Sequence, residues 1–314
     1  MCPDTLFFPS RSSDDEEATL HRTLANFNRA RFSPGFADGN WRHDLDEEAR
    51  LKLLEGEFIE GERQSIHGEL EGVPSNPSEF IAWFEGLYHS GRGQGDALFP
   101  WLSEHATRDQ VLWFLHQEVA GEAGFDDLVA LTQVRLPTRP KLELARNYWD
   151  EMGRGQAKGM HGPMLARLAK SLGLAPRPET TVWQSLALGN LMSGFAANRR
   201  YAYQSLGALG VIELTAPSRA SYVAKALKRL GVEAKLRLYF ELHAVLDVRH
   251  SEAWVREVLH PLATADSRAI PSLAEGALLR LRAGLRCFTR YREQFGIAGT
   301  DALKTSTTGQ PRNG

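Results

Sequence analysis

The chain has 314 residues, of which 42% are hydrophobic, enough to bury one large core or two modest ones. Its 37 basic and 39 acidic residues nearly balance, so the charge does not suggest a nucleic-acid partner. The longest apolar runs are too short or too interrupted to span a bilayer, and the start of the chain lacks the pattern of a secretory signal. We therefore expect a cytoplasmic protein with no membrane partner.

The cysteine content limits the kinds of site that the chain can build. Only Cys2 and Cys287 are present, too few for a disulfide framework or a thiolate metal site. Any metal must therefore be held by histidine and carboxylate side chains.

The first 76 residues predict an N-terminal extension that is partly helical. We expect one helix from about residue 16 to Phe32, a loop over residues 33–40, and a highly charged helix over residues 45–60. This extension is expected to lie against a core formed by residues 77–295.

The core predicts helices throughout, with no convincing strand. Asn76 and Pro77 start the first helix, and Pro137 and Pro140 end a long amphipathic one. The expected helical ranges are 80–89, 107–134, 142–151, 161–172, 180–210, 218–230, from about 233 onward, 252–262 and 270–295. Residues 296–314 predict a disordered tail. The fold class is therefore all-α, a single helical bundle with an N-terminal helical extension.

The clearest chemical pattern lies between Leu238 and His250. His243, Asp247 and His250 stand at i, i+4 and i+7, and at about 100° per residue they fall within roughly 60° of one another on a helix. The residues between them are mostly apolar, which indicates that the three side chains face the protein interior. This helix therefore predicts half of a metal site.

Other helices offer candidates for the opposite half. Glu118 lies on the apolar side of its helix, although Glu122, one turn away, is an alternative. Glu151 and His161 would be about 15 Å apart in an unbroken helix, but three glycines between them permit a break. Glu213 is a lone charge after a run of small and apolar residues. Four carboxylates and three imidazoles suit two divalent metals with positions left for dioxygen; iron is the first candidate and manganese its competitor.

The order Glu118, Glu151-x9-His161, Glu213 and His243-x3-Asp247-x2-His250 resembles the ligand pattern of the heme-oxygenase-like diiron oxidases and oxygenases, an iron-containing redox enzyme family. The resemblance covers roughly residues 77–295 and implies a heme-oxygenase-like bundle that holds two Fe(II) ions and uses O2. It further implies that Glu151 bridges the metals and that Glu213 engages as the oxidation state changes. Glu118, Glu151 and His161 would supply one side of the cluster, and the 243–250 stripe the other.

The resemblance implies oxidation of a small amino acid or amino-acid-derived metabolite in specialised biosynthesis, by N-oxygenation, desaturation or C–C cleavage. An external reductant or electron-donor protein would accompany O2. The sequence leaves open a fatty-acid decarboxylase or desaturase of the same family, a metal-free thiaminase-like or quinone-cofactor-synthesis enzyme of the same fold, and a helical interaction protein. It also leaves open a homodimer. Candidates for anchoring the substrate, against the alternative of a solvated basic cluster, are Arg199, Arg200, Tyr203 and Arg237.

Overall fold

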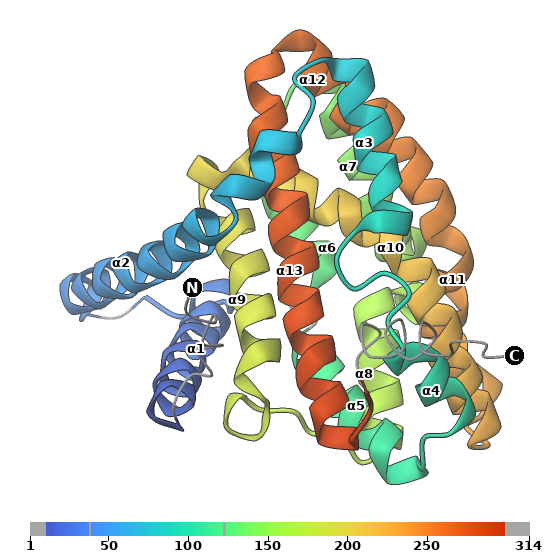
Figure 1. Cartoon of the computed structure of the whole chain (residues 1–314). Coiled ribbons are helices and arrows are strands. Elements are labelled where there is room, and N and C mark those ends of the chain that lie inside the picture. Colours follow the sequence, from blue (N-terminus) through green and yellow to red (C-terminus); the bar gives the residue numbers. More distant parts are fainter. Residues whose placement is uncertain (1–10, 38, 122–123, 299–314) are drawn as a thin grey trace, which may run out of the picture.

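A computed structural model describes residues 11–37, 39–121 and 124–298, and within these ranges the chain is helical with no strand (Figure 1). The expectation of an all-α fold is confirmed. The helices are α1 (Arg11–Phe32), α2 (Trp41–Ser65), α3 (Pro77–Ser90), α4 (Leu98–Glu104), α5 (Arg108–Gly121), α6 (Phe125–Thr132), α7 (Thr138–Glu151), α8 (His161–Ser171), α9 (Trp183–Ala197), α10 (Ala202–Arg229), α11 (Ala234–Trp254), α12 (His260–Ala265) and α13 (Ile270–Phe295). A π-helical segment, Val255–Leu259, joins α11 to α12. None of the described helices is long and apolar enough to cross a bilayer.

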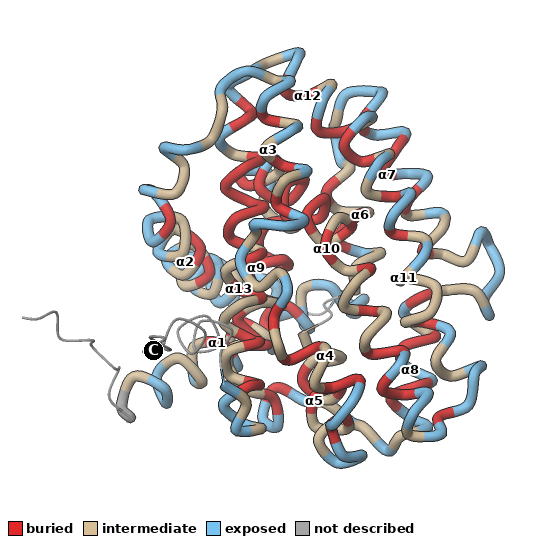
Figure 2. Tube along the Cα trace, turned by 45° about the vertical axis from the view of Figure 1, so that its right-hand side comes forward, coloured by how far each residue is buried: buried red, intermediate tan, exposed pale blue. Residues whose placement is uncertain are grey.

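Helix α10 lies at the centre of the bundle, packed between α11 and α13 (Figures 1 and 2). Small residues make this close packing possible. A Cβ atom at Gly207 would lie 1.8 Å from the carbonyl oxygen of Leu273, and one at Gly276 would lie 1.9 Å from that of Gln204. Since no side chain fits at these two contacts, glycine fixes the approach of α10 to α13 and with it the position of the next turns of α10.

The N-terminal helices lie on one side of this bundle. Helix α1 packs against α9, where the buried Asn28 side chain donates a hydrogen bond to Asn190, and the side chain of Asn190 donates to the backbone oxygen of His21. Helix α2 extends away from the bundle in Figure 1 and buries only Glu55 and Ile59. The described part of the extension thus contains the helices α1 and α2, separated by non-helical residues 33–37 and 39–40. Its division from the core at residue 76 stays a prediction.

Several expected helices have different bounds in the structure. The helix expected over 107–134 is two helices, α5 and α6, because Gly124 before α6 has a φ of 70° that ends regular helix. The helix expected over 180–210 is also interrupted, since α9 ends at Ala197 and α10 begins at Ala202. Conversely, α10 continues through Pro217, where we expected a break. Residues 299–314 of the expected disordered tail lie outside the described residues, and α13 ends at Phe295 as predicted.

Candidate metal centre

Six of the seven expected ligands lie in two groups of three. Glu151, His161 and His243 form the first group, and within it the candidate ligand atoms all lie within 4.8 Å of one another. The same limit holds for the second group, Glu213, Asp247 and His250. Below we call them the His–His–Glu group and the carboxylate-rich group. Helix α11 contributes to both.

The stripe on α11 faces inward, as its spacing predicts. Asp247 and His250 are buried, whereas Val245 and Val248 on the outer side are 64% and 49% exposed. The ligand side chains therefore set which side of α11 is internal, and apolar residues occupy the outer side. The Nδ1–H of His243 donates to the carbonyl oxygen of Tyr239 at 2.7 Å, which leaves Nε2 as the ligand atom.

The segment between α7 and α8 brings His161 back to Glu151. Helix α7 ends at Glu151, two short 3₁₀ turns follow, and α8 begins at His161. An isolated antiparallel bridge between Met152 and Met160 closes the segment, so that Nδ1 of His161 lies 2.8 Å from Oε2 of Glu151. Gly153, with a φ of 60°, permits the turn, because a Cβ there would lie 2.3 Å from the carbonyl carbon of Gly159. The expected glycine-dependent break is thus present.

Two polar residues of α7 orient the carboxylate-rich group, and neither was predicted from the sequence. Asn147 donates a hydrogen bond from Nδ2 to Oε1 of Glu213 at 2.6 Å. Asp150 accepts one from Nε2 of His250 at 3.2 Å and is itself held by Arg154. Their signal was present in the sequence, since Asn147, Asp150 and Glu151 stand at helical spacing on one side of α7. That spacing shows which residues share a side but not which helix they face.

Electrostatics at the two groups differ. Burial lowers the pKa of His250, but the neighbouring carboxylates of Glu213, Asp150 and Glu151 outweigh burial and raise it to about 9. Burial lowers the pKa of His243, only partly opposed by Glu151. The carboxylate-rich group thus already attracts positive charge, while the imidazole of His243 favours the neutral form that binds metals.

The residues fit a pair of divalent metal ions. Nδ1 of His161 and Nδ1 of His250 are buried and make no hydrogen bond, although each faces carboxylate oxygens. Three carboxylates, of Glu151, Glu213 and Asp247, are also buried at this place. Buried carboxylates that face imidazole nitrogens without hydrogen-bond geometry are costly unless a cation lies between them. The His–His–Glu group, with two histidines and one carboxylate, is also a ligand set typical of non-heme Fe(II).

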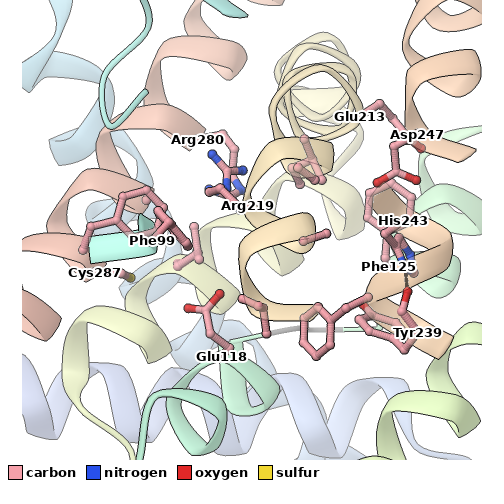
Figure 3. A pocket seen from close by; sticks show the side chains of 18 of the residues that line it. Phe99, Glu118, Phe125, Glu213, Arg219, Tyr239, His243, Asp247, Arg280 and Cys287 are labelled. Atoms are coloured by element: carbon pink, nitrogen blue, oxygen red, sulfur yellow. Dashed lines mark hydrogen bonds between the residues drawn. The ribbon is translucent and has the colours of Figure 1, made fainter. Parts of the chain in front are cut away.

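A cavity of about 120 Å³ adjoins both groups, and Glu118 lines its far side (Figure 3). Glu118 belongs to neither group, and its Oε1 accepts a hydrogen bond from the Tyr291 hydroxyl at 3.0 Å. Burial raises its pKa, opposed by Tyr291, Arg280 and Arg219. The structure therefore does not bring Glu118 to the other six residues, and its expected role as a ligand rests on the sequence alone. The alternative ligand, Glu122, lies outside the described residues.

The four expected substrate anchors do not line this cavity. Arg199 donates to the backbone oxygen of Thr132, Arg200 pairs with Glu60, and Arg237 pairs with Glu241. Tyr203 is 41% exposed. The three arginines thus contact a helix end and acidic residues elsewhere. The sequence shows a basic cluster but not the direction in which its side chains point. The cavity contains two other arginines, Arg219 and Arg280.

Comparison with known proteins places these residues in a family. A family model described as iron-containing redox enzyme matches residues 112–285, more than half of the chain. The matched range includes all six grouped residues and runs from α5 into α13. The chain matches no curated protein.

Proposed function

Because this chain belongs to the iron-containing redox enzyme family, we propose that it is a non-heme diiron oxidase or oxygenase that uses O2 to oxidise a small amino acid or a metabolite derived from one. The observation that carries the proposal is the pair of three-residue groups, which share α11 and adjoin one internal cavity. Such a pair suits two metal ions beside a common substrate space.

Each group would hold one Fe(II), and the residues around them have distinct roles. Glu151, His161 and His243 would bind the first ion, and Glu213, Asp247 and His250 the second. Glu151 remains our proposed bridge, since its charge also acts on His250. Glu213 remains the proposed mobile ligand, with Asn147 holding one of its oxygens when the other is released.

The bound iron pair would supply two of the electrons that reduce dioxygen. The complete reduction of O2 to water takes four electrons, so the substrate gives the other two and an external reductant restores Fe(II) after each turnover. In an N-oxygenation, one oxygen atom enters the substrate and the other leaves as water. In a desaturation, two hydrogens leave the substrate and both oxygen atoms leave as water. The protein's part is to hold the substrate against the groups and to exclude bulk water.

Two alternatives from the sequence are less well supported. A metal-free thiaminase-like reaction needs a nucleophile, but burial raises the pKa of Cys287, the cysteine on this cavity, to about 12, so it stays a thiol. A long-chain fatty acid needs more room than this cavity gives. A cavity of about 150 Å³ holds a benzene-sized molecule, and this one is smaller.

Iron loading under exclusion of oxygen tests the proposal. We expect two iron atoms per chain by metal analysis, and a change in absorbance that appears only when O2 is added. A protein that takes up fewer than one iron per chain, or whose ferrous form does not react with O2, would contradict it.

The two groups can be separated by variants. His161→Ala should lower the iron content from two per chain towards one, and so should His250→Ala, while the double variant should bind none. Circular dichroism provides the control that helical content is kept. Manganese, the competing metal, is tested by loading the same protein with Mn(II) and asking whether it reacts with O2.

A further inference from the structure

We infer that dioxygen reaches the iron pair through a second cavity, separate from the space that the substrate occupies. This outer cavity has a volume of about 170 Å³ and is lined by residues of α8, of the end of α5 and of the start of α6. The inference rests on the proposed function, because it requires iron at the His–His–Glu group.

The outer cavity ends at the metal-binding residues. Glu151 and His161 line it, and both are buried. Glu151 also lines the catalytic cavity, which is our name for the space of about 120 Å³ that adjoins both groups. A small molecule at the inner end of the outer cavity therefore lies beside the His–His–Glu group without having crossed the catalytic cavity.

The other end of the outer cavity opens at the surface of α8. Gly162 and Ala166 line it one turn apart on the same side of α8, and both are exposed. Their small size leaves the opening wide, since no atom lies within 4 Å of a Cβ at Gly162. The outer cavity thus leads from solvent to buried Glu151 and His161.

The lining of the outer cavity suits a small apolar molecule. Val119, Phe125 and Leu165 provide apolar surface between the two ends. Apart from the metal-binding residues, Asp126 is the only ionisable acid or base among the lining residues that the structure describes, tyrosine aside. Such surface admits O2, which is uncharged and apolar, more readily than it admits a charged substrate.

Two aromatic side chains, Phe125 and Tyr239, line both cavities and so form a wall between them. The centre of the Tyr239 ring lies 4.3 Å from that of His243, and Figure 3 shows this pair on the side of the catalytic cavity away from Phe99 and Cys287. The wall therefore lies next to the His–His–Glu group, so molecules on its two sides approach the same proposed iron ion.

A separate route for O2 is needed once the substrate is bound. The catalytic cavity is small, so a bound substrate fills it and blocks passage through it. A further pocket of about 310 Å³ shares Phe99 and Arg219 with the catalytic cavity and has polar lining residues such as His89 and Ser218. That polar pocket suits the approach of a polar substrate, and the apolar outer cavity is left to O2.

Association of nitric oxide with the ferrous protein tests this route. Nitric oxide is a small, nearly apolar gas that binds ferrous iron rapidly, so its association rate reports access to the metal and not the later chemistry. Ala166→Phe narrows the opening, and Leu165→Trp fills the cavity from its wall. Each should slow association about tenfold, which corresponds to about 1.4 kcal/mol added to the barrier for entry. Stopped-flow absorbance under exclusion of oxygen would measure the rates.

Controls separate the outer cavity from the surface and from the catalytic cavity. Lys170→Phe adds the same ring to an exposed position of α8, one turn beyond Ala166, that does not line the outer cavity. Phe240→Trp narrows the catalytic cavity, and Phe240 does not line the outer one. Both should bind nitric oxide at the wild-type rate. Metal analysis and circular dichroism would check that every variant keeps its iron and its helices.

Xenon locates the route without depending on iron. Xenon occupies apolar cavities, so a crystal of the wild type under xenon pressure should contain a xenon atom beside Leu165. The Ala166→Phe and Leu165→Trp variants should contain less xenon at this place.

Several results would overturn the inference. They are wild-type rates of nitric oxide association in both Ala166→Phe and Leu165→Trp, a slower rate in Phe240→Trp alone, or xenon confined to the catalytic cavity. If the wild type holds two irons and reacts with O2 but the two blocking variants bind nitric oxide at the full rate, only this inference fails. If the wild type holds no iron, the proposed function fails and the inference fails with it.

Discussion

At the scale of single residues, hydrogen-bond partners determine which ring nitrogen of each histidine on α11 is available to bind a metal ion. The carbonyl oxygen of Tyr239 only accepts, so Nδ1 of His243 carries the proton and Nε2 is the ligand atom. The carboxylate of Asp150 likewise only accepts, so Nε2 of His250 carries the proton and Nδ1 faces Glu213 and Asp247. Two histidines on one helix thus present opposite nitrogens because their partners come from different helices.

Replacing Asp150 tests this arrangement. In Asp150→Asn the ring of His250 loses its charged acceptor, so we expect the carboxylate-rich group to bind its Fe(II) about 10- to 100-fold more weakly, while the His–His–Glu group is unaffected. Stepwise titration with Fe(II) under exclusion of oxygen would measure the two affinities. Asp44→Asn, on the exposed side of α2, is the matched control. Two unchanged affinities would show that Asp150 does not support the site.

Site residues that share one helix could be predicted from the sequence to lie together. His243, Asp247 and His250 share a side of α11 because the helical repeat dictates it, and the structure brings them together with Glu151, His161 and Glu213. Partners across helices were not predictable in this way. Asn147, Asp150, Arg219 and Arg280 are ordinary polar residues in the sequence, and only the packing of α7, α10 and α13 shows what they face.

At the scale of elements, the segment between α7 and α8 controls the His–His–Glu group. Its left-handed residues, Gly153, Arg154 and Gly155, turn the chain so that the bridge between Met152 and Met160 can form. Arg154 adopts this conformation without being glycine, and its side chain binds Asp150. The segment therefore positions His161 and, through Arg154 and Asp150, also supports His250.

A single added methyl group should disturb this segment. In Gly153→Ala the new Cβ meets the backbone at Gly159, so His161 is displaced and the iron content should fall from two per chain towards one. Gly162→Ala is the matched control, because it lies just beyond the segment and no atom is within 4 Å of a Cβ there. Metal analysis with circular dichroism would check both. Full iron content in Gly153→Ala would show that the turn tolerates a side chain.

Docking of α1 should depend on pH through His21. Burial lowers the pKa of this histidine from 6.5 to about 3. The unfolded chain therefore binds the proton first as pH falls, so the stability contributed by neutral His21 is complete above pH 6.5 and is lost between pH 6.5 and 3. The loss is about 1.4 kcal/mol per pH unit for one proton.

Urea denaturation of the wild type and of His21→Gln at several pH values would measure this effect. Subtracting one from the other removes the titration of groups that do not contact His21. Glu17, whose carboxylate lies 3.2 Å from Nε2 of His21, is therefore replaced by glutamine in both proteins. We expect the stability advantage of the wild type to shrink from pH 7 to pH 5. An advantage that is independent of pH would mean that His21 is not held neutral.

Helix ends could be predicted where a residue at the end itself, such as asparagine or glycine, caps the helix. They could not be predicted where packing between helices overrides the local effect of a residue. Asn76 caps α3 with its side chain and Gly296 ends α13, as their residue types predict. Pro217, however, lies inside α10, one turn after Glu213, and cannot donate to the carbonyl oxygen of Glu213. The contacts of α10 with α11 and α13 along its length keep it helical despite this loss. No local rule contains that information.

At the scale of the whole molecule, the six grouped residues connect four helices, α7, α8, α10 and α11, that span residues 138–254. Their carboxylates oppose folding when no cation is present, because like charges are buried together.

Metal binding should therefore stabilise the entire bundle. At free Fe(II) 100 times above the dissociation constant the gain is about 2.7 kcal/mol per site. At roughly 2–4 °C per kcal/mol, a chelator should therefore lower Tm by about 11–22 °C for two sites. Differential scanning calorimetry under exclusion of oxygen, with and without chelator, would measure the difference. The His161→Ala and His250→Ala double variant is the control, since its Tm should no longer respond to the chelator. A wild-type Tm that ignores the chelator would mean that these helices are held together without the metals.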